Sequence, residues 1–251
     1  MSLISVSDLH ISSTQDPLYR SLLSLIETRL KSGDIFVLAG DIFDLFVGNK
    51  KVFVGRYQEF FDSLQAASVR GVKIHYIEGN HDFQIKHVFS RIEGLQVHPR
   101  DVLIEMNGKR FFFSHGDLVD PKDYGYFALR AFLRSPVMKA FVTVMPGRVI
   151  AAIGNAMSAT SQKKGPRLPA NLPTPQMERL RILYRSFAAE KLSQGYDFVV
   201  MGHCHDLDEM QFNIGGRPGQ YINIGYPRAH GSFVSWHEGD AVIGREKMPE
   251  A

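Results

Sequence analysis

Five short clusters in the sequence contain side chains that bind divalent metal ions. In chain order they are Asp8-Leu9-His10, Gly40-Asp41, Gly79-Asn80-His81-Asp82, His115 and Gly202-His203-Cys204-His205. Imidazole nitrogens combined with carboxylate and amide oxygens suit Mn²⁺, Fe or Zn²⁺ better than Ca²⁺. A carboxylate can bridge two cations, because each of its oxygens can bind one. The clusters therefore predict a pair of divalent cations that activate a water molecule against a phosphate ester or anhydride.

Each of the first three clusters follows a segment predicted to be a buried strand. These strands are Leu3–Ser7, Asp34–Ala39 and Val72–Ile77, and they alternate with helices predicted over Pro17–Lys31 and Arg56–Arg70. Such alternation is typical of parallel sheets, which bind ligands at the carboxyl ends of their strands. Residues two apart at a strand end point the same way, so Asp8 with His10, and His203 with His205, are expected to face one pocket.

A second group of strands is predicted in the rest of the chain. Val102–Met106 and Lys109–Ser114 flank Asn107-Gly108, which is a strong hairpin signal. After a helix predicted over Gln176–Gln194, further strands are expected at Asp197–Met201, Glu209–Ile214, Gln220–Ile224, Ser232–Trp236 and Ala241–Arg245. The predicted fold class is therefore α/β, with two packed mixed sheets and helices outside them.

The composition narrows the class of protein. A chain of 251 residues with 44% hydrophobic and 22% charged residues is typical of a folded globular protein. One cysteine, Cys204, excludes an internal disulfide and fits a reducing compartment. The first residues lack the basic region of a signal peptide, and no apolar run approaches the roughly 20 residues of a membrane span.

One segment differs from its surroundings, because residues 126–177 contain no Asp or Glu but seven Lys and Arg. Its apolar stretches are divided at Pro136 and at Pro146-Gly147, which predicts several short helices. One interpretation is a helical subdomain with a solvated basic face. The other is a cap for an amphiphilic anionic substrate, or a surface that rests on anionic lipid. We favour the second, since apolar bulk, basic charge and the lack of acidic residues coincide beside the metal clusters.

The set of clusters resembles the calcineurin-like metallophosphoesterase superfamily. That resemblance implies a four-layer αββα sandwich, with Asp41 bridging two cations. The implied ligands of one ion are Asp8, His10 and His205, and those of the other are Asn80, His115 and His203. His81 is expected to donate a hydrogen bond to a phosphoryl or leaving oxygen, while Asp82 or Asp44 orients a histidine.

Over nearly its full length the chain is also similar to the UDP-2,3-diacylglucosamine diphosphatase family of the lipid A pathway of Gram-negative bacteria. This resemblance implies a single domain over 1–251 with a helical cap insertion at about 121–175. It implies cleavage of the substrate's pyrophosphate to UMP and 2,3-diacylglucosamine 1-phosphate, usually with Mn²⁺. It further implies a cytoplasmic enzyme, peripheral on the cytoplasmic face of the inner membrane, and no nucleic-acid partner.

The same resemblance implies a set of substrate-binding positions: Asn80, His81, Asp123, Tyr126, Ser158, Gln162, Lys164 and His203. Two positions depart from the family pattern, because His81 and Asn155 stand where arginine is common. Both arginines would be expected to hold substrate phosphate, so the departures concern the substrate and not the metal centre.

Three alternatives remain open at this point. One is a phosphodiesterase or phosphatase for a soluble nucleotide, a phosphoprotein or another anionic lipid. A nuclease fits less well, since the basic residues cluster with aliphatic ones and not along a groove with stacking aromatics. A non-catalytic scaffold of the same fold is the third. The remaining histidines are expected to be surface or strand residues, His230 being the one also considered for the site, and the side chain of Cys204 is expected to point away from the metals.

Overall fold

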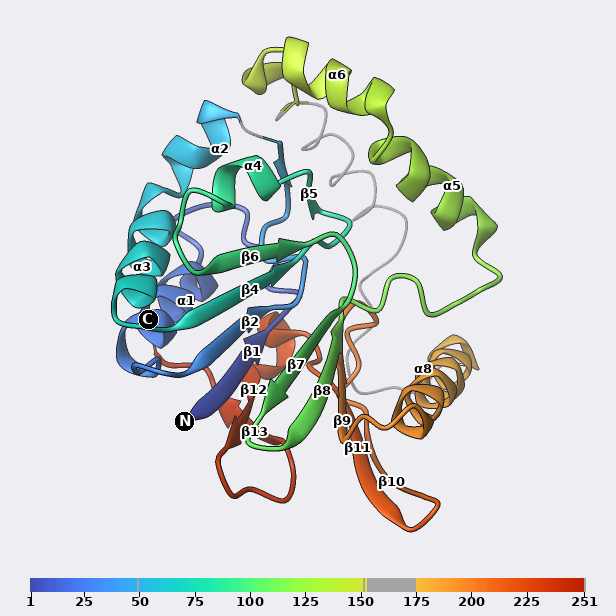
Figure 1. The fold of residues 1–251 in the computed structure, drawn as a ribbon. Helices are drawn as coiled ribbons and strands as arrows, with labels where there is room; N and C mark the ends of the chain where they lie inside the picture. The colour runs from blue at the N-terminus through green and yellow to red at the C-terminus, as the bar shows by residue number, and fades with distance from the viewer. Residues whose placement is uncertain (49, 151, 153–174, 251) are drawn as a thin grey trace.

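Two mixed β-sheets pack face to face, and helices cover their outer surfaces (Figure 1). The computed structural model of the chain describes residues 1–48, 50–150, 152 and 175–250. Between the sheets, Leu3 and Val37 of one meet Phe111 and Val200 of the other. Separate apolar clusters join helices to the outer face of each sheet. The layers therefore run helix, sheet, sheet, helix, which confirms the predicted fold class.

The six-stranded sheet carries the N-terminal part of the candidate site. Its order is β13-β12-β1-β2-β4-β6, with bounds Gly244–Lys247, Ser232–His237, Ser2–Val6, Ile35–Leu38, Lys73–Ile77 and Leu95–His98. Strands β1, β2, β4 and β6 are parallel, whereas β12 runs antiparallel to β1 and β13. Because parallel strands end at one edge, the loops after β1, β2 and β4 bring Asp8, Asp41 and Asn80 together.

The five-stranded sheet supplies the remaining ligand candidates. Its order is β10-β11-β9-β8-β7, with bounds Glu209–Ile214, Arg217–Asn223, Phe198–Met201, Lys109–Ser114 and Val102–Met106. The inner strands β8, β9 and β11 are parallel, and the predicted hairpin of β7 and β8 is present. His115 follows β8 directly, and His203 follows β9 by two residues.

Local sequence explains where the long helices begin and what they bury. Helix α1 (Pro17–Thr28) begins with proline, and the Asp16 side chain caps it by accepting from Leu18 N. Its buried stripe joins α3 (Gln58–Val69) on the six-stranded sheet. Helix α8 (Pro175–Ser193) packs on the five-stranded sheet through Tyr184 and Leu192. The shorter helices are α2 (Lys51–Arg56), α4 (Lys86–Phe89) and α9 (Pro227–His230).

Two further helices, α5 (Tyr124–Leu133) and α6 (Pro136–Val144), stand apart from the sheets at the top and upper right of Figure 1. We call them the cap helices. Asp123 and Ser135 cap their N-termini, which explains the division predicted at Pro136. In the described ranges, none of the helices combines the length and the apolar character that crossing a bilayer requires.

The sequence did not predict every element. The two-stranded sheet of β3 (Phe46–Val47) and β5 (Asp82–Phe83), strand β6 and helices α2, α4 and α9 were not anticipated, because their apolar segments are too short to show a period. Strand β13 begins at Gly244 and not at Ala241. The backbone N–H of Ile243 donates to the Gln220 side chain at 2.7 Å, and the Trp236 indole donates to the carbonyl of Asp240, so this stretch is held outside the sheet.

Candidate metal centre

Tight left-handed turns aim most of the candidate ligands. Asp8, His10, Asp41, His203 and His205 all have positive φ, between 47° and 70°. Residues other than glycine rarely adopt this conformation, and it costs roughly 1 kcal/mol or more at each position. Strand alternation predicted that residues two apart would lie together. They do, but the left-handed turns are the cause, because these residues lie beyond the strand ends. Backbone hydrogen bonds from Asp8 N to Gly40 O (3.1 Å) and from His10 N to Asp41 O (3.0 Å) stabilise the turns.

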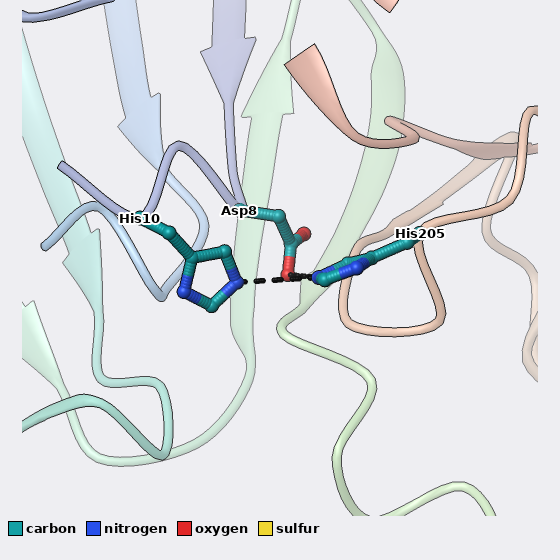
Figure 2. Close-up of side chains that lie close together, drawn as sticks. All are labelled: Asp8, His10 and His205. Atoms are coloured by element: carbon teal, nitrogen blue, oxygen red, sulfur yellow. Dashed lines mark hydrogen bonds and ion pairs between the residues drawn. The ribbon is translucent and has the colours of Figure 1, made fainter. Parts of the chain in front are cut away.

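The first group of ligand atoms comes from Asp8, His10 and His205, which converge from two loops (Figure 2). The Nε2 atom of His205 lies 3.4 Å from Oδ1 of Asp8 and 3.2 Å from Nε2 of His10. Asp8 is fully buried, and its Oδ2 accepts hydrogen bonds from Ser7 and from the N–H of His203. Its Oδ1 has no hydrogen-bond partner among the described residues. A buried, unpartnered carboxylate oxygen facing two imidazoles fits a cation.

The second group contains Asn80, His115 and His203. The Nε2 atom of His115 lies 3.2 Å from Oδ1 of Asn80 and 3.2 Å from Nδ1 of His203. On the other side of the ring, His115 Nδ1 lies 3.0 Å from the carbonyl oxygen of Ala39. A proton on Nδ1 donated to that carbonyl leaves the lone pair of Nε2 directed at the other two side chains.

Asp41 lies between the two groups. Its Oδ2 is 3.5 Å from Nε2 of His115 and 3.9 Å from Nε2 of His10. Its Oδ1 accepts the backbone N–H of His81 at 2.9 Å. Oδ2 alone therefore faces both groups, instead of each oxygen facing one group. The reason is that Oδ1 is held by the loop that carries Asn80. This position suits a carboxylate shared by two ions.

Close packing of the loops requires glycine at two positions. A Cβ atom on Gly79 would overlap Oδ1 of Asp41, and one on Gly202 would overlap Oδ2 of Asp8. Both oxygens belong to candidate ligands, so even alanine would displace a carboxylate. The glycines of the motifs are therefore needed for close approach of the loops.

The histidines of the site differ in the direction in which their pKa values shift. Burial lowers the pKa of His10 to about 3 and, together with the neighbouring His115, lowers that of His203 to about 4. Both rings are therefore neutral near pH 7, the form that binds metal. For Asp8 and His115, burial disfavours the charged form, but neighbouring charges outweigh it. The pKa of Asp8 nevertheless falls to about 2 through His205, and that of His115 rises to about 10 through Asp41. A cation bound by His115 must displace this proton.

His81 points into the same region but is held differently. Its Nδ1 lies 2.8 Å from the carbonyl oxygen of Asp44, and its ring stands edge-on to His10 with centroids 4.8 Å apart. Burial lowers the pKa of His81, but Asp41 and Asp44 outweigh it and raise the pKa above its ordinary value. The protonated form is favoured, which suits a hydrogen-bond donor. Nitrogen and oxygen atoms of His10, Asp44 and His81 also lie within 4.8 Å of one another.

Asp82 was expected to orient a histidine, but its hydrogen bonds go to backbone groups and to a tyrosine. Its Oδ1 accepts the backbone N–H groups of Asp41 (3.0 Å) and Gly79 (2.9 Å). Its Oδ2 accepts Ile42 N at 2.8 Å and the Tyr76 hydroxyl at 2.7 Å. The buried carboxylate therefore ties the loop of Asp41 to the loop of Asn80 through backbone groups and not through a histidine.

The substrate-binding positions lie in part beside the centre. Asp123, Tyr126 and His203 line one cavity of about 330 Å³. The Tyr126 hydroxyl donates to Asp117, its ring centroid lies 6.1 Å from that of His203, and Asp123 caps α5. Ser158, Gln162, Lys164 and Asn155 lie outside the described residues. Cys204 points away from the ligands, since its Sγ accepts from Asn223 and packs in the apolar cluster under α8.

The sequence did not single out Tyr226 and Arg228, which support the first group of ligands. The Tyr226 ring stacks on that of His205, with centroids 4.4 Å apart and planes 8° apart. Arg228 donates to the carbonyls of Leu9 and His10, both at 3.2 Å, and pairs with Asp16. His230 accepts the N–H of Tyr226 and so supports the turn. The Gly-Tyr-Pro-Arg turn at 225–228 was the only local signal.

Metal-binding side chains gathered where the strands of two packed mixed sheets end are the arrangement of a metallophosphoesterase. Residues 1–207 match the family described as calcineurin-like phosphoesterases, so the chain belongs to that family, as predicted. Among curated proteins, a UDP-2,3-diacylglucosamine hydrolase of Aeromonas salmonicida is 24% identical over 99% of this chain and 95% of its own. The protein of that name from Enterobacter is 23% identical over 93% of this chain and 94% of its own.

A third relative of that name, from Pseudomonas aeruginosa, is 24% identical over 90% of each chain. Among solved structures, a phosphoesterase from E. coli aligns with 99% of this chain and 100% of its own, with a TM-score of 0.43 and 16% identity. The family and the hydrolase relatives make the chain a metal-dependent hydrolase of phosphate esters or anhydrides. These findings favour the hydrolase over the scaffold alternative.

Proposed function

We propose that this chain cleaves the pyrophosphate of UDP-2,3-diacylglucosamine to UMP and 2,3-diacylglucosamine 1-phosphate at a two-metal centre. The observation that carries the two-metal part is the position of Asp41, whose Oδ2 faces both groups of imidazoles. Three curated relatives of nearly equal length carry the name UDP-2,3-diacylglucosamine hydrolase, which supports the substrate.

In this proposal Asp8, His10 and His205 hold one ion, Asn80, His115 and His203 hold the other, and Asp41 bridges them. Two divalent cations, most readily Mn²⁺ with Fe or Zn²⁺ as alternatives, would lower the pKa of a bound water and offset the charge of the phosphate under attack. The protein's part is to hold neutral imidazoles and ionised carboxylates at fixed positions.

The remaining residues bind the substrate or hold the ligand loops in place. His81, fixed through its Nδ1 by the Asp44 carbonyl, directs the other side of its ring outward, where Nε2 donates to a phosphoryl or leaving oxygen. Asp82 acts at a distance, by holding the Asp41 and Asn80 loops together. Asp123, Tyr126 and His203 line the adjoining cavity of about 330 Å³, where the substrate lies in this proposal, with Ser158, Gln162 and Lys164 as further contacts.

The cap helices supply the apolar surface for acyl chains. Tyr124, Phe132, Val137 and Val144 are all more than half exposed, a large share for aromatic and aliphatic side chains. Arg130 and Arg134, by contrast, are engaged within the protein. Arg130 pairs with Asp117 at 2.8 Å, and Arg134 donates to the carbonyl of Gly79 at 3.1 Å. Within residues 126–177, which lack acidic side chains, phosphate contacts therefore fall to the other basic residues.

The same apolar surface, flanked by basic residues, supports peripheral attachment to anionic lipid at the cytoplasmic face of the inner membrane. A hydrolase at that position reaches an acylated substrate without extracting it from the bilayer.

The direct test is an assay of the purified chain with Mn²⁺ on UDP-2,3-diacylglucosamine, with both products identified. We expect UMP and the 1-phosphate, and much slower cleavage of the same nucleotide sugar without acyl chains. Equal rates on both would indicate a soluble nucleotide substrate instead. The absence of the family's arginines at His81 and Asn155 would then be explained by the different substrate.

A further inference from the structure

A second cavity, of about 400 Å³, lies between the cap and the β3–β5 region and away from the candidate metal ligands. Its wall includes five basic side chains, Lys50, Lys86, His87, Arg134 and Lys139, and Gln84. None of its lining residues is acidic. Helix α6 closes one side of it, near α2 and α4 in Figure 1. Such a concentration of like charge in a concave surface attracts anions.

Two of the five basic groups are already engaged. The ammonium of Lys50 donates to the carbonyls of Thr143 (2.9 Å) and Met145 (2.7 Å), which fixes α6 over the cavity. Arg134 donates to the Gly79 carbonyl, and its Nη2 lies 3.5 Å from Oε2 of Glu78. The Nε atom of Arg134 is nevertheless buried without a hydrogen-bond partner among the described residues.

The other three side chains have no compensating charge. Lys86, His87 and Lys139 make no side-chain hydrogen bond or ion pair in the part of the chain that the structure describes. Positions 49, 151, 153–174 and 251 contain no Asp or Glu, so all 26 acidic side chains belong to described residues. No carboxylate side chain elsewhere in the sequence is therefore left to neutralise the cavity.

We propose that this cavity binds a phosphate group. A phosphate carries negative charge on oxygens that can accept from several donors at once, which matches two free ammonium groups and an imidazole. An acyl chain would bury these charges at a cost and satisfy none of them. Arg134 also connects the cavity to the centre, because the carbonyl it binds belongs to Gly79, directly before Asn80. The inference does not depend on the proposed substrate.

The test counts phosphate ions bound per chain. The metal-loaded full-length protein is dialysed to equilibrium against radiolabelled inorganic phosphate, alongside Lys86→Ala/Lys139→Ala. Both lysines are exposed, so the fold should be kept. We expect the double variant to bind one phosphate fewer than the wild type, or to bind the second at least about tenfold more weakly, since charge-assisted contacts are worth a factor of ten or more each.

Lys31→Ala/Lys73→Ala is the matched control. It removes two exposed lysines near the amino ends of β2 and β4, whereas the candidate metal ligands follow the carboxyl ends of these strands. It should bind as many phosphates as the wild type. Kinetics then separate the two sources of the phosphate. If the substrate supplies it, the cavity variant raises KM for the pyrophosphate substrate but not for a nitrophenyl phosphodiester. If free phosphate is the ligand, KM is unchanged. Equal phosphate binding by the wild type and the cavity variant, or equal loss in both double variants, would overturn the proposal.

Discussion

The Oδ2 atom of Asp41 lies 3.5 Å from the Nε2 atom of His115, and both side chains are buried. Burial lowers the pKa of His115, but this carboxylate outweighs it and raises the pKa to about 10. A metal ion that takes the place of that proton would supply positive charge to the same two atoms. The site is therefore built for positive charge at this point.

His81→Ala should lower kcat by roughly 10²–10⁴, the usual contribution of a positioned acid or base, and leave the metal content unchanged. The reason is that His81 is held by the Asp44 carbonyl, while in the proposed centre the neighbouring Asn80 is the ligand. Loss of one ion from His81→Ala would instead make it a ligand. His81→Arg, which restores the residue common in the diphosphatase family, should keep more activity than the alanine variant.

Tyr226→Ala should weaken metal binding by about 10- to 100-fold, the range seen when partners that orient ligands are removed. The Tyr226 ring stacks on His205 at 4.4 Å, so its removal frees that imidazole to rotate. Chelator competition measures the effect. Tyr226→Phe keeps the ring and should bind metal as the wild type does. A similar loss in both variants would assign the effect to the hydroxyl and not to stacking.

Phe132→Asp with Val137→Asp on the cap helices should raise KM sharply for the diacylated substrate and hardly change hydrolysis of a soluble nitrophenyl phosphodiester. Both side chains are exposed, at 54% and 73%, so the charges should not unfold the protein. Val142 is a poor choice for this test, because it is only 5% exposed and belongs to the main apolar cluster. Val69→Asp with Leu103→Asp, at exposed apolar positions outside the cap helices, is the control. If the diester suffers equally, the cap helices have a structural role only.

Much of this centre could be predicted from the sequence, because its ligands follow apolar runs long enough to identify as strands. Asp8 after Leu3–Ser7 and His203 after Asp197–Met201 are examples. The left-handed turns could not be predicted, since nothing local forces Asp41 or His205 into positive φ. The roles of Asp82 and Arg228 depend on hydrogen bonds between loops 41 and 218 residues apart in the chain. Contacts of that kind become visible only when the sheets are assembled.

Acid should destabilise the fold partly through His75 and His98, which lie in β4 and β6 with ring nitrogens 3.1 Å apart. Burial lowers the pKa of His75 to about 4, and that of His98 also falls. The unfolded chain protonates His75 near pH 6.5, so it binds more protons than the folded chain between about pH 6.5 and 4. Stability is complete above this interval and falls by about 3 kcal/mol across it. Denaturant unfolding should show a smaller loss in His75→Gln, and an equal loss in both would contradict this account.

Metal content per chain together with turnover, measured for the wild type and for Asp41→Ala, tests the two-metal centre most directly. The wild type should hold two ions. Asp41→Ala should hold at most one and lose turnover, because the oxygen that faces both His10 and His115 is gone. Thermal unfolding of both proteins checks that the fold is kept. Two tightly bound ions in Asp41→Ala with a near-normal rate would contradict the account.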